Sequence, residues 1–139
     1  MRLGSNSAAH SALVEDLILA GSTHFSRLWK QPVGTGRALK SERVIRFGVR
    51  GMADCGGILG CGKRLEVEAK TGTGRLSADQ KRWKETIERF RGVYLTARSV
   101  HALEELLEAH ADECPICSNL RASTRPATVP PPPPPPAAE

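Results

Sequence analysis

Residues 64–70 read RLEVEAK and form the clearest β-strand pattern in the chain, because apolar and charged residues alternate strictly. One face would carry Leu65, Val67 and Ala69, and the other Arg64, Glu66, Glu68 and Lys70. Glu68 and Lys70 therefore reach the same small volume. A charged strand face is also often only a solvated sheet surface, and the pattern alone leaves both interpretations open.

The segments before this strand predict a helix and a further strand. Residues 8–20 place apolar side chains at helical spacing: Leu13, Val14, Leu17 and Ile18. Residues 43–49 alternate like a strand, a Gly34 and Gly36 pair before it predicts a turn, and residues 48–62 form a Gly-rich connection.

The segments after it add two helices and a strand. Ser77 with Gln80 forms a capping-box pattern that opens a helix ending near residue 91. A β-rich run follows at 92–97 and a second helix at 99–111. The expected inward-facing residues are Trp83, Ile87, Phe90, Val100, Leu103, Leu106 and Leu107. This order predicts an α/β fold with a mixed central β-sheet flanked by helices.

The length of 139 residues fits one domain, expected over residues 1–121. Residues 122–139 include an unbroken proline run from Pro130 to Pro136, which predicts a disordered, proline-rich C-terminal tail. No apolar stretch is long enough for a membrane helix, and the first 20 residues lack a signal-peptide pattern. We expect no membrane association and a cytoplasmic, intracellular location.

Basic charge is concentrated before the RLEVEAK strand. The net charge is +5 with a pI near 9.3, and residues 27–50 hold seven bases against one acid. With only six aromatic residues, base stacking on single strands explains this charge poorly, and backbone contacts to duplex DNA explain it better. The candidate DNA-binding residues are Arg37, Lys40, Arg43, Arg46, Arg50 and Arg75. A single basic residue of this kind is more often an ordinary surface residue than a phosphate contact.

Two carboxylates and a lysine suggest metal-dependent chemistry. Asp54 precedes the RLEVEAK strand in the Gly-rich connection, where it can meet Glu68. Two carboxylates with backbone and water oxygens suit Mg²⁺, and Lys70 can orient water and offset phosphate charge. Glu66 is either an outer neighbour of this site or a solvated side chain.

The four cysteines are interpreted as thiols, because no secretion signal accompanies them. Cys114 and Cys117 form a CxxC pair that, with Cys55 and Cys61, gives one possible four-thiolate zinc site. The C-x5-C spacing is unusual and the pairs are far apart in sequence. A redox role is less favoured still, because the motif follows a helix and does not open one from a strand, so incidental thiols are the default expectation.

The chain resembles the VRR-NUC domains, a branch of the PD-(D/E)xK nuclease superfamily that includes stand-alone phage proteins. The resemblance spans about residues 10–107. It rests on GMAD at 51–54, GIL at 57–59, EAKT at 68–71, GRLS at 74–77, Gln80 and GVYLTARS at 92–99.

This resemblance implies roles for individual residues. Asp54 and Glu68 would be metal ligands, Ala69 would offer its backbone carbonyl, and Lys70 would position the attacking water. Gln80 would contact the metal-bound water or the substrate. Its alternative role is the capping-box partner of Ser77, and one side chain can seldom do both.

Three positions depart from the family pattern. Ala53 stands where proline is usual, and Cys55 replaces an aliphatic residue. His10 occupies the place of a glutamate on the first helix, where imidazole would accept Mn²⁺ readily and Mg²⁺ poorly. One alternative is that His10 is only a hydrogen-bonded core histidine. Glu15 is a less well-placed substitute for the missing glutamate ligand.

The resemblance implies a restriction-endonuclease-like fold and a Mg²⁺-dependent endodeoxyribonuclease, with Mn²⁺ able to substitute, that cuts branched or junction DNA. We expect a homodimer and no nucleotide cofactor. If the protein is phage-encoded, its expected location is the host cytoplasm. The alternatives are a catalytically inactive DNA-binding module with the same fold, and a zinc-stabilised adaptor that works through the proline tail.

Overall fold

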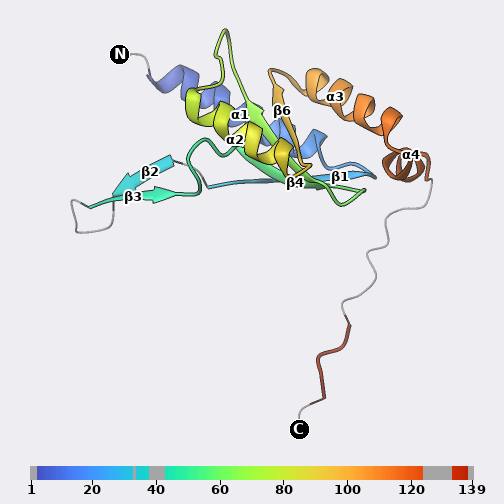
Figure 1. Ribbon diagram of the computed structural model, residues 1–139. Coiled ribbons are helices and arrows are strands. Elements are labelled where there is room, and N and C mark those ends of the chain that lie inside the picture. Colours follow the sequence, from blue (N-terminus) through green and yellow to red (C-terminus); the bar gives the residue numbers. More distant parts are fainter. Residues whose placement is uncertain (1–2, 33, 38–42, 124–132, 138–139) are drawn as a thin grey trace.

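The computed structural model describes residues 3–32, 34–37, 43–123 and 133–137. Along the chain, the helices and strands are α1 (Leu3–Ala20), β1 (Ser26–Lys30), β2 (Gly34–Arg37), β3 (Val44–Phe47), β4 (Cys55–Leu59), β5 (Arg64–Ala69), α2 (Ala78–Arg89), β6 (Val93–Ala97), α3 (Val100–Glu113) and α4 (Pro115–Ala122) (Figure 1). The expected α/β class, with a mixed sheet flanked by helices, is confirmed.

The central sheet has four strands in the order β1-β4-β5-β6. β4 is antiparallel to both β1 and β5, whereas β6 runs parallel to β5 after the α2 crossover. The turn between β4 and β5 contains Gly62, whose φ of +88° favours glycine. β2 and β3 form a separate antiparallel hairpin to one side of this sheet (Figure 1).

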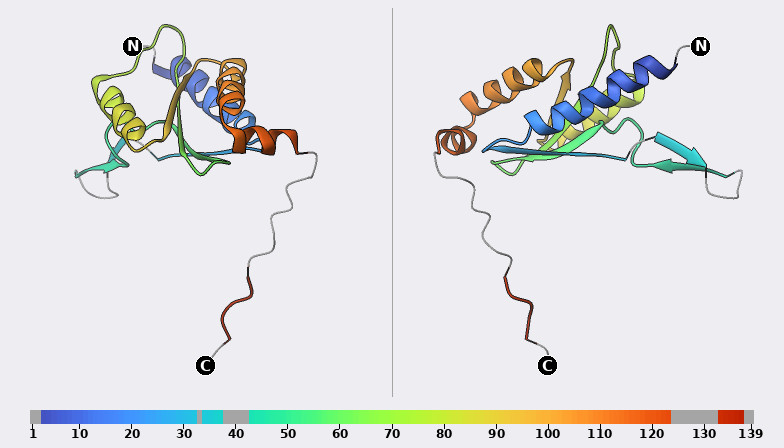
Figure 2. Two further views of the ribbon diagram at one scale, coloured as in Figure 1. Left: turned by 45° about the vertical axis from the view of Figure 1, so that its right-hand side comes forward. Right: turned by 180° about the vertical axis from the view of Figure 1, so that it is seen from behind.

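Helices cover both faces of β5, as Figure 2 shows with α2 on one side and α1 and α3 on the other. The main core joins α1 and α3 to the sheet through fully buried leucines such as Leu17, Leu65 and Leu103. On the α2 side, Glu66 is 0% and Glu68 4% exposed. The charged face of RLEVEAK is therefore not a solvated sheet surface.

The structure corrects several local expectations. Gly34 and Gly36 lie in β2 and do not form a turn, and the Gly-rich connection contains β4. Phe90, expected in the core, is 76% exposed because it caps the end of α2, just before Arg91 adopts a positive φ. Leu106 on α3 is 37% exposed.

The C-terminal region differs most from expectation. α4 was not predicted, and it extends to Ala122, so the expected boundary after residue 121 falls in its last turn. Most of the expected disordered tail lies outside the described residues; residues 133–137 are exposed and form neither helix nor strand. None of the described helices combines the length and apolar character needed to cross a membrane.

Candidate functional site

Strand pairing brings Asp54 and Glu68 together. The antiparallel register pairs Cys55 with Val67, so the next position places Asp54 opposite Glu68. The Asp54 backbone N–H donates to Glu68 Oε2 at 3.2 Å, and the Ala69 N–H donates to Asp54 Oδ2 at 3.0 Å. Both carboxylates are thus oriented by the backbone of the neighbouring strand, and the expected encounter of the two acids is observed.

His10 reaches the same place from α1. Its Nε2 atom lies 3.1 Å from Asp54 Oδ2, and ligand atoms of His10, Asp54 and Glu68 all lie within 4.8 Å of one another. A cavity of about 190 Å³ beside them is lined by His10, Ser11, Val14, Lys30, Gln31, Pro32 and Asp54. His10 is therefore hydrogen-bonded to a site carboxylate, whereas Glu15 is exposed.

Lys70 and Gln80 complete the cluster on the α2 side. The Lys70 Nζ atom lies 3.5 Å from Glu68 Oε1 and donates to Gln80 Oε1 at 3.0 Å. Gln80 Nε2 donates to Glu68 Oε1, also at 3.0 Å. The same Gln80 Oε1 accepts from the Ser77 backbone N–H at 2.9 Å. Gln80 therefore caps α2 and also contacts Lys70 and Glu68, whereas its expected contact with a metal-bound water or the substrate stays a prediction.

The Asp54 and Glu68 carboxylates lie close together, and this proximity affects the pKa values of nearby groups. Burial, with a further contribution from Asp54, raises the pKa of Glu68 to about 7, although Lys70 lowers it. Burial next to the same carboxylates raises the pKa of Cys55 to about 12, which keeps that thiol neutral. A divalent cation would offset the repulsion between the two acids. The donor set of two carboxylates and an imidazole fits Mn²⁺ well, and its oxygen atoms also fit Mg²⁺.

Glu66 fixes the backbone next to Asp54 through hydrogen bonds. Its carboxylate accepts from Trp83 Nε1 at 2.8 and 2.9 Å, from Gln31 Nε2 at 3.1 Å and from the Ala53 N–H at 3.1 Å. Gln31 Nε2 also donates to the Ala53 carbonyl at 3.0 Å. Sequence reasoning missed Gln31 and the hydrogen bond of Trp83. The only signal for Glu66 was its position two residues before Glu68 on the same strand face.

The candidate DNA contacts are only partly described. Arg50 is exposed on the loop before β4, and Arg75 is exposed on the loop before α2. Arg43 is also exposed and is not without a partner. Lys40 and the side chains of Arg37 and Arg46 lie outside the described part of the chain. β1 ends at Lys30, which pairs with Cys55 at the start of β4, next to Asp54. The β2–β3 hairpin comes after this end of β1 in the chain and therefore begins near the carboxylate site (Figure 1).

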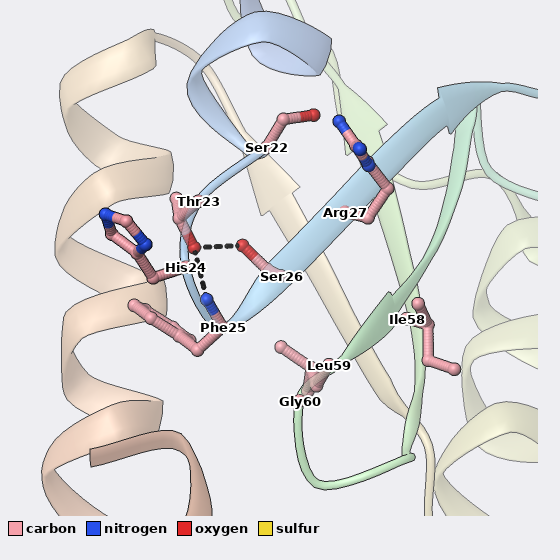
Figure 3. Close-up of a pocket in the computed structure, with 9 residues that line it drawn as sticks. All are labelled: Ser22, Thr23, His24, Phe25, Ser26, Arg27, Ile58, Leu59 and Gly60. Atoms are coloured by element: carbon pink, nitrogen blue, oxygen red, sulfur yellow. Dashed lines mark hydrogen bonds between the residues drawn. The ribbon is translucent and has the colours of Figure 1, made fainter. Parts of the chain in front are cut away.

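A larger pocket lies at the other end of the β1–β4 pair (Figure 3). It measures about 560 Å³ and is lined by residues 22–27 and 58–60. Ser26 pairs with Leu59, four positions along β1 from the Lys30–Cys55 pair, which is about 13 Å of strand. Its Thr23 and Ser26 hydroxyls bond to each other at 2.7 Å. This pocket is thus separate from the carboxylate site.

Comparison of the chain with protein families, with curated proteins and with solved structures found no match. The resemblance to VRR-NUC nucleases therefore stays a prediction, and function is inferred from the geometry of the residues themselves.

Proposed function

We propose that the protein is a metal-dependent endodeoxyribonuclease that hydrolyses phosphodiester bonds at the site formed by Asp54, Glu68 and Lys70. The observation that carries this proposal is the convergence of the buried Glu68 carboxylate, the partly buried Asp54 carboxylate and the His10 imidazole, whose ligand atoms lie within 4.8 Å of one another. A lysine Nζ atom lies 3.5 Å from one of those carboxylates. Binding DNA by itself needs neither the two acids nor the lysine beside them.

Asp54 and Glu68 would hold Mg²⁺ or Mn²⁺, which would polarise a phosphoryl oxygen and stabilise the charge that develops on it. His10 is a candidate third ligand, better suited to Mn²⁺ than to Mg²⁺. The Ala69 N–H donates to Asp54 Oδ2 and so orients that carboxylate. The role of the Ala69 backbone carbonyl as a further metal ligand stays a prediction.

Lys70 would position the attacking water and offset the charge of the phosphate. Its side chain is 17% exposed, so its ammonium group is only partly hydrated. Gln80 holds Nζ next to Glu68 through the bonds to both side chains. Because Ser77 fixes Gln80 at the first turn of α2, the position of the lysine is tied to a rigid element of the fold.

The proposed substrate is duplex or branched DNA. The basic segment over residues 27–50 would contact phosphates next to the carboxylate site, since the hairpin that carries part of it starts there. Junction selectivity, a homodimer with one site for each strand and a cytoplasmic location are further parts of this proposal. They derive from the family resemblance.

The test is cleavage of duplex, single-stranded, flapped and four-way-junction DNA with Mg²⁺, Mn²⁺ or EDTA. We expect metal-dependent cutting that falls by about 10²- to 10³-fold in Lys70→Ala, the usual effect of removing one group that stabilises the charge of the transition state. Lys63→Ala is the matched control, because Lys63 is exposed on the turn at the far end of β4. Metal-dependent cutting that survives Lys70→Ala unchanged would rule out this mechanism. DNA binding without cutting by the metal-loaded wild type would favour the inactive module.

A further inference from the structure

A second cluster of metal-binding residue types lies at the opposite end of β4 from Asp54. Cys61 comes from the β4–β5 turn, His110 from the last turn of α3, and Cys114 and Cys117 from the start of α4. One ligand atom from each of these residues lies within 4.8 Å of all the others. Cys61 Sγ and His110 Nε2 are 3.8 Å apart.

We propose that these four residues form a structural zinc site of the Cys₃His type. Tetrahedral zinc, with bonds of about 2.3 Å to sulfur and 2.0 Å to nitrogen, places neighbouring donor atoms about 3.5–3.8 Å apart. The Cys61–His110 distance of 3.8 Å is close to this range, and all four donor atoms lie within 4.8 Å of one another, so side-chain rotations that shorten these distances by at most about 1 Å would close the cluster around the ion. Four protein donors leave no open coordination position, which is the property of structural zinc sites and not of catalytic ones.

The start of α4 supports a thiolate ligand. Cys114 is the N-cap of α4, so its side chain lies at the N-terminus of this helix, and no side-chain hydrogen bond caps the helix there. The positive end of the helix dipole favours the negative charge that a zinc-bound thiolate carries.

The ion would give α4 an attachment that its own packing supplies weakly. Cys117 is the only buried residue of α4, and Ile116 is 54% exposed. Arg121 pairs with Glu108 and Asp112 of α3 at 2.6 and 2.8 Å, but surface ion pairs of this kind contribute little to stability. A zinc ion would cross-link the β4–β5 turn, the end of α3 and the start of α4.

This ligand set differs from the one considered from the sequence. Cys55 lies fully buried in β4, outside the cluster, and His110 takes the fourth position. The CxxC motif follows α3, as expected, and it also opens α4, a helix that was not predicted. All four cysteines are free thiols in the structure, so each of the three in the cluster is available as a ligand.

The test is the zinc content of the full-length protein, produced with zinc in the medium, kept reduced and dialysed against a weak chelator. We expect about one zinc per chain. Cobalt substitution should give the visible bands of a tetrahedral site and thiolate-to-cobalt charge transfer. Replacement of Cys114 or Cys117 by serine, or of His110 by alanine, should remove the metal.

Three matched variants keep the result specific. Cys55→Ala removes a cysteine outside the cluster, and His101→Ala removes an exposed histidine on the same helix as His110. Asp54→Asn disables the other candidate metal site. All three should retain zinc.

Wild-type protein without zinc and without cobalt–thiolate bands would overturn the proposal, whatever the folding of the variants. Zinc that persists in Cys114→Ser and is lost in Asp54→Asn would also overturn it, because the ion would then belong to the carboxylates. A disulfide among Cys61, Cys114 and Cys117 in protein isolated with zinc present would do the same.

Discussion

Glu68→Gln tests the electrostatics of the carboxylate site without changing its shape. The pKa of Glu68 is raised from 4.5 to about 7, a difference that corresponds to about 3 kcal/mol. Between these pH values the folded protein holds a proton that the unfolded chain does not. The free energy of unfolding of the metal-free protein should therefore fall as pH rises from about 5 to about 8. Glutamine stays neutral and removes this dependence.

The substitution also has a cost. Glu68 accepts hydrogen bonds at both oxygens, from the Asp54 N–H and from Gln80, and glutamine keeps one acceptor, so about 1 kcal/mol is lost. The net expectation is a metal-free variant that is about 1–2 kcal/mol more stable than wild type near pH 8 and no more stable near pH 5. A gain in stability on losing a site residue is typical of a functional position.

The assay is urea denaturation in EDTA at both pH values, with the exposed Glu85→Gln as control. Added Mg²⁺ or Mn²⁺ should stabilise wild type and leave Glu68→Gln unchanged, because ligand binding to the folded state adds to stability. A variant with the same pH dependence as wild type, or with lower stability near pH 8, would refute this reasoning.

Three further predictions concern the rest of the molecule. Ser77→Ala should lower the free energy of unfolding by about 1 kcal/mol, since it removes the cap of α2; no loss in urea denaturation would contradict the observed capping box. Tyr94→Phe should leave stability unchanged or raise it slightly, because the buried Tyr94 hydroxyl has no partner among the described residues; a clear loss in thermal denaturation would argue against this. Arg50→Ala should reduce the slope of log affinity for duplex DNA against log salt by about 1, measured by fluorescence anisotropy; an unchanged slope would exclude a phosphate contact there.

Local patterns predicted the elements whose causes are local. The alternation of RLEVEAK identified β5, and Ser77 with Gln80 identified the start of α2 through a bond between neighbours in sequence. β4 was missed because its glycines look like a loop. A methyl group at Gly57 would overlap the Arg27 carbonyl oxygen of β1, so glycine serves close strand packing there. That contact joins residues far apart in sequence.

The candidate site shows the same division. Glu68 and Lys70 follow from strand geometry, whereas the approach of His10 to Asp54 joins residues 44 positions apart and depends on how α1 packs. The burial of Glu66 depends on Trp83 from α2 and Gln31 after β1. Phe90 and Leu106 lie on apolar faces, but periodicity does not show whether anything covers the end of such a face.

The most direct measurement is single-turnover cleavage of the best DNA substrate by wild type and by Asp54→Asn, with Mg²⁺ and with EDTA. If Asp54 and Glu68 hold the catalytic cation, wild type cuts only with metal and Asp54→Asn falls to the rate seen in EDTA, while both bind DNA alike. Metal-dependent cleavage by Asp54→Asn at the wild-type rate would contradict the assignment of this site.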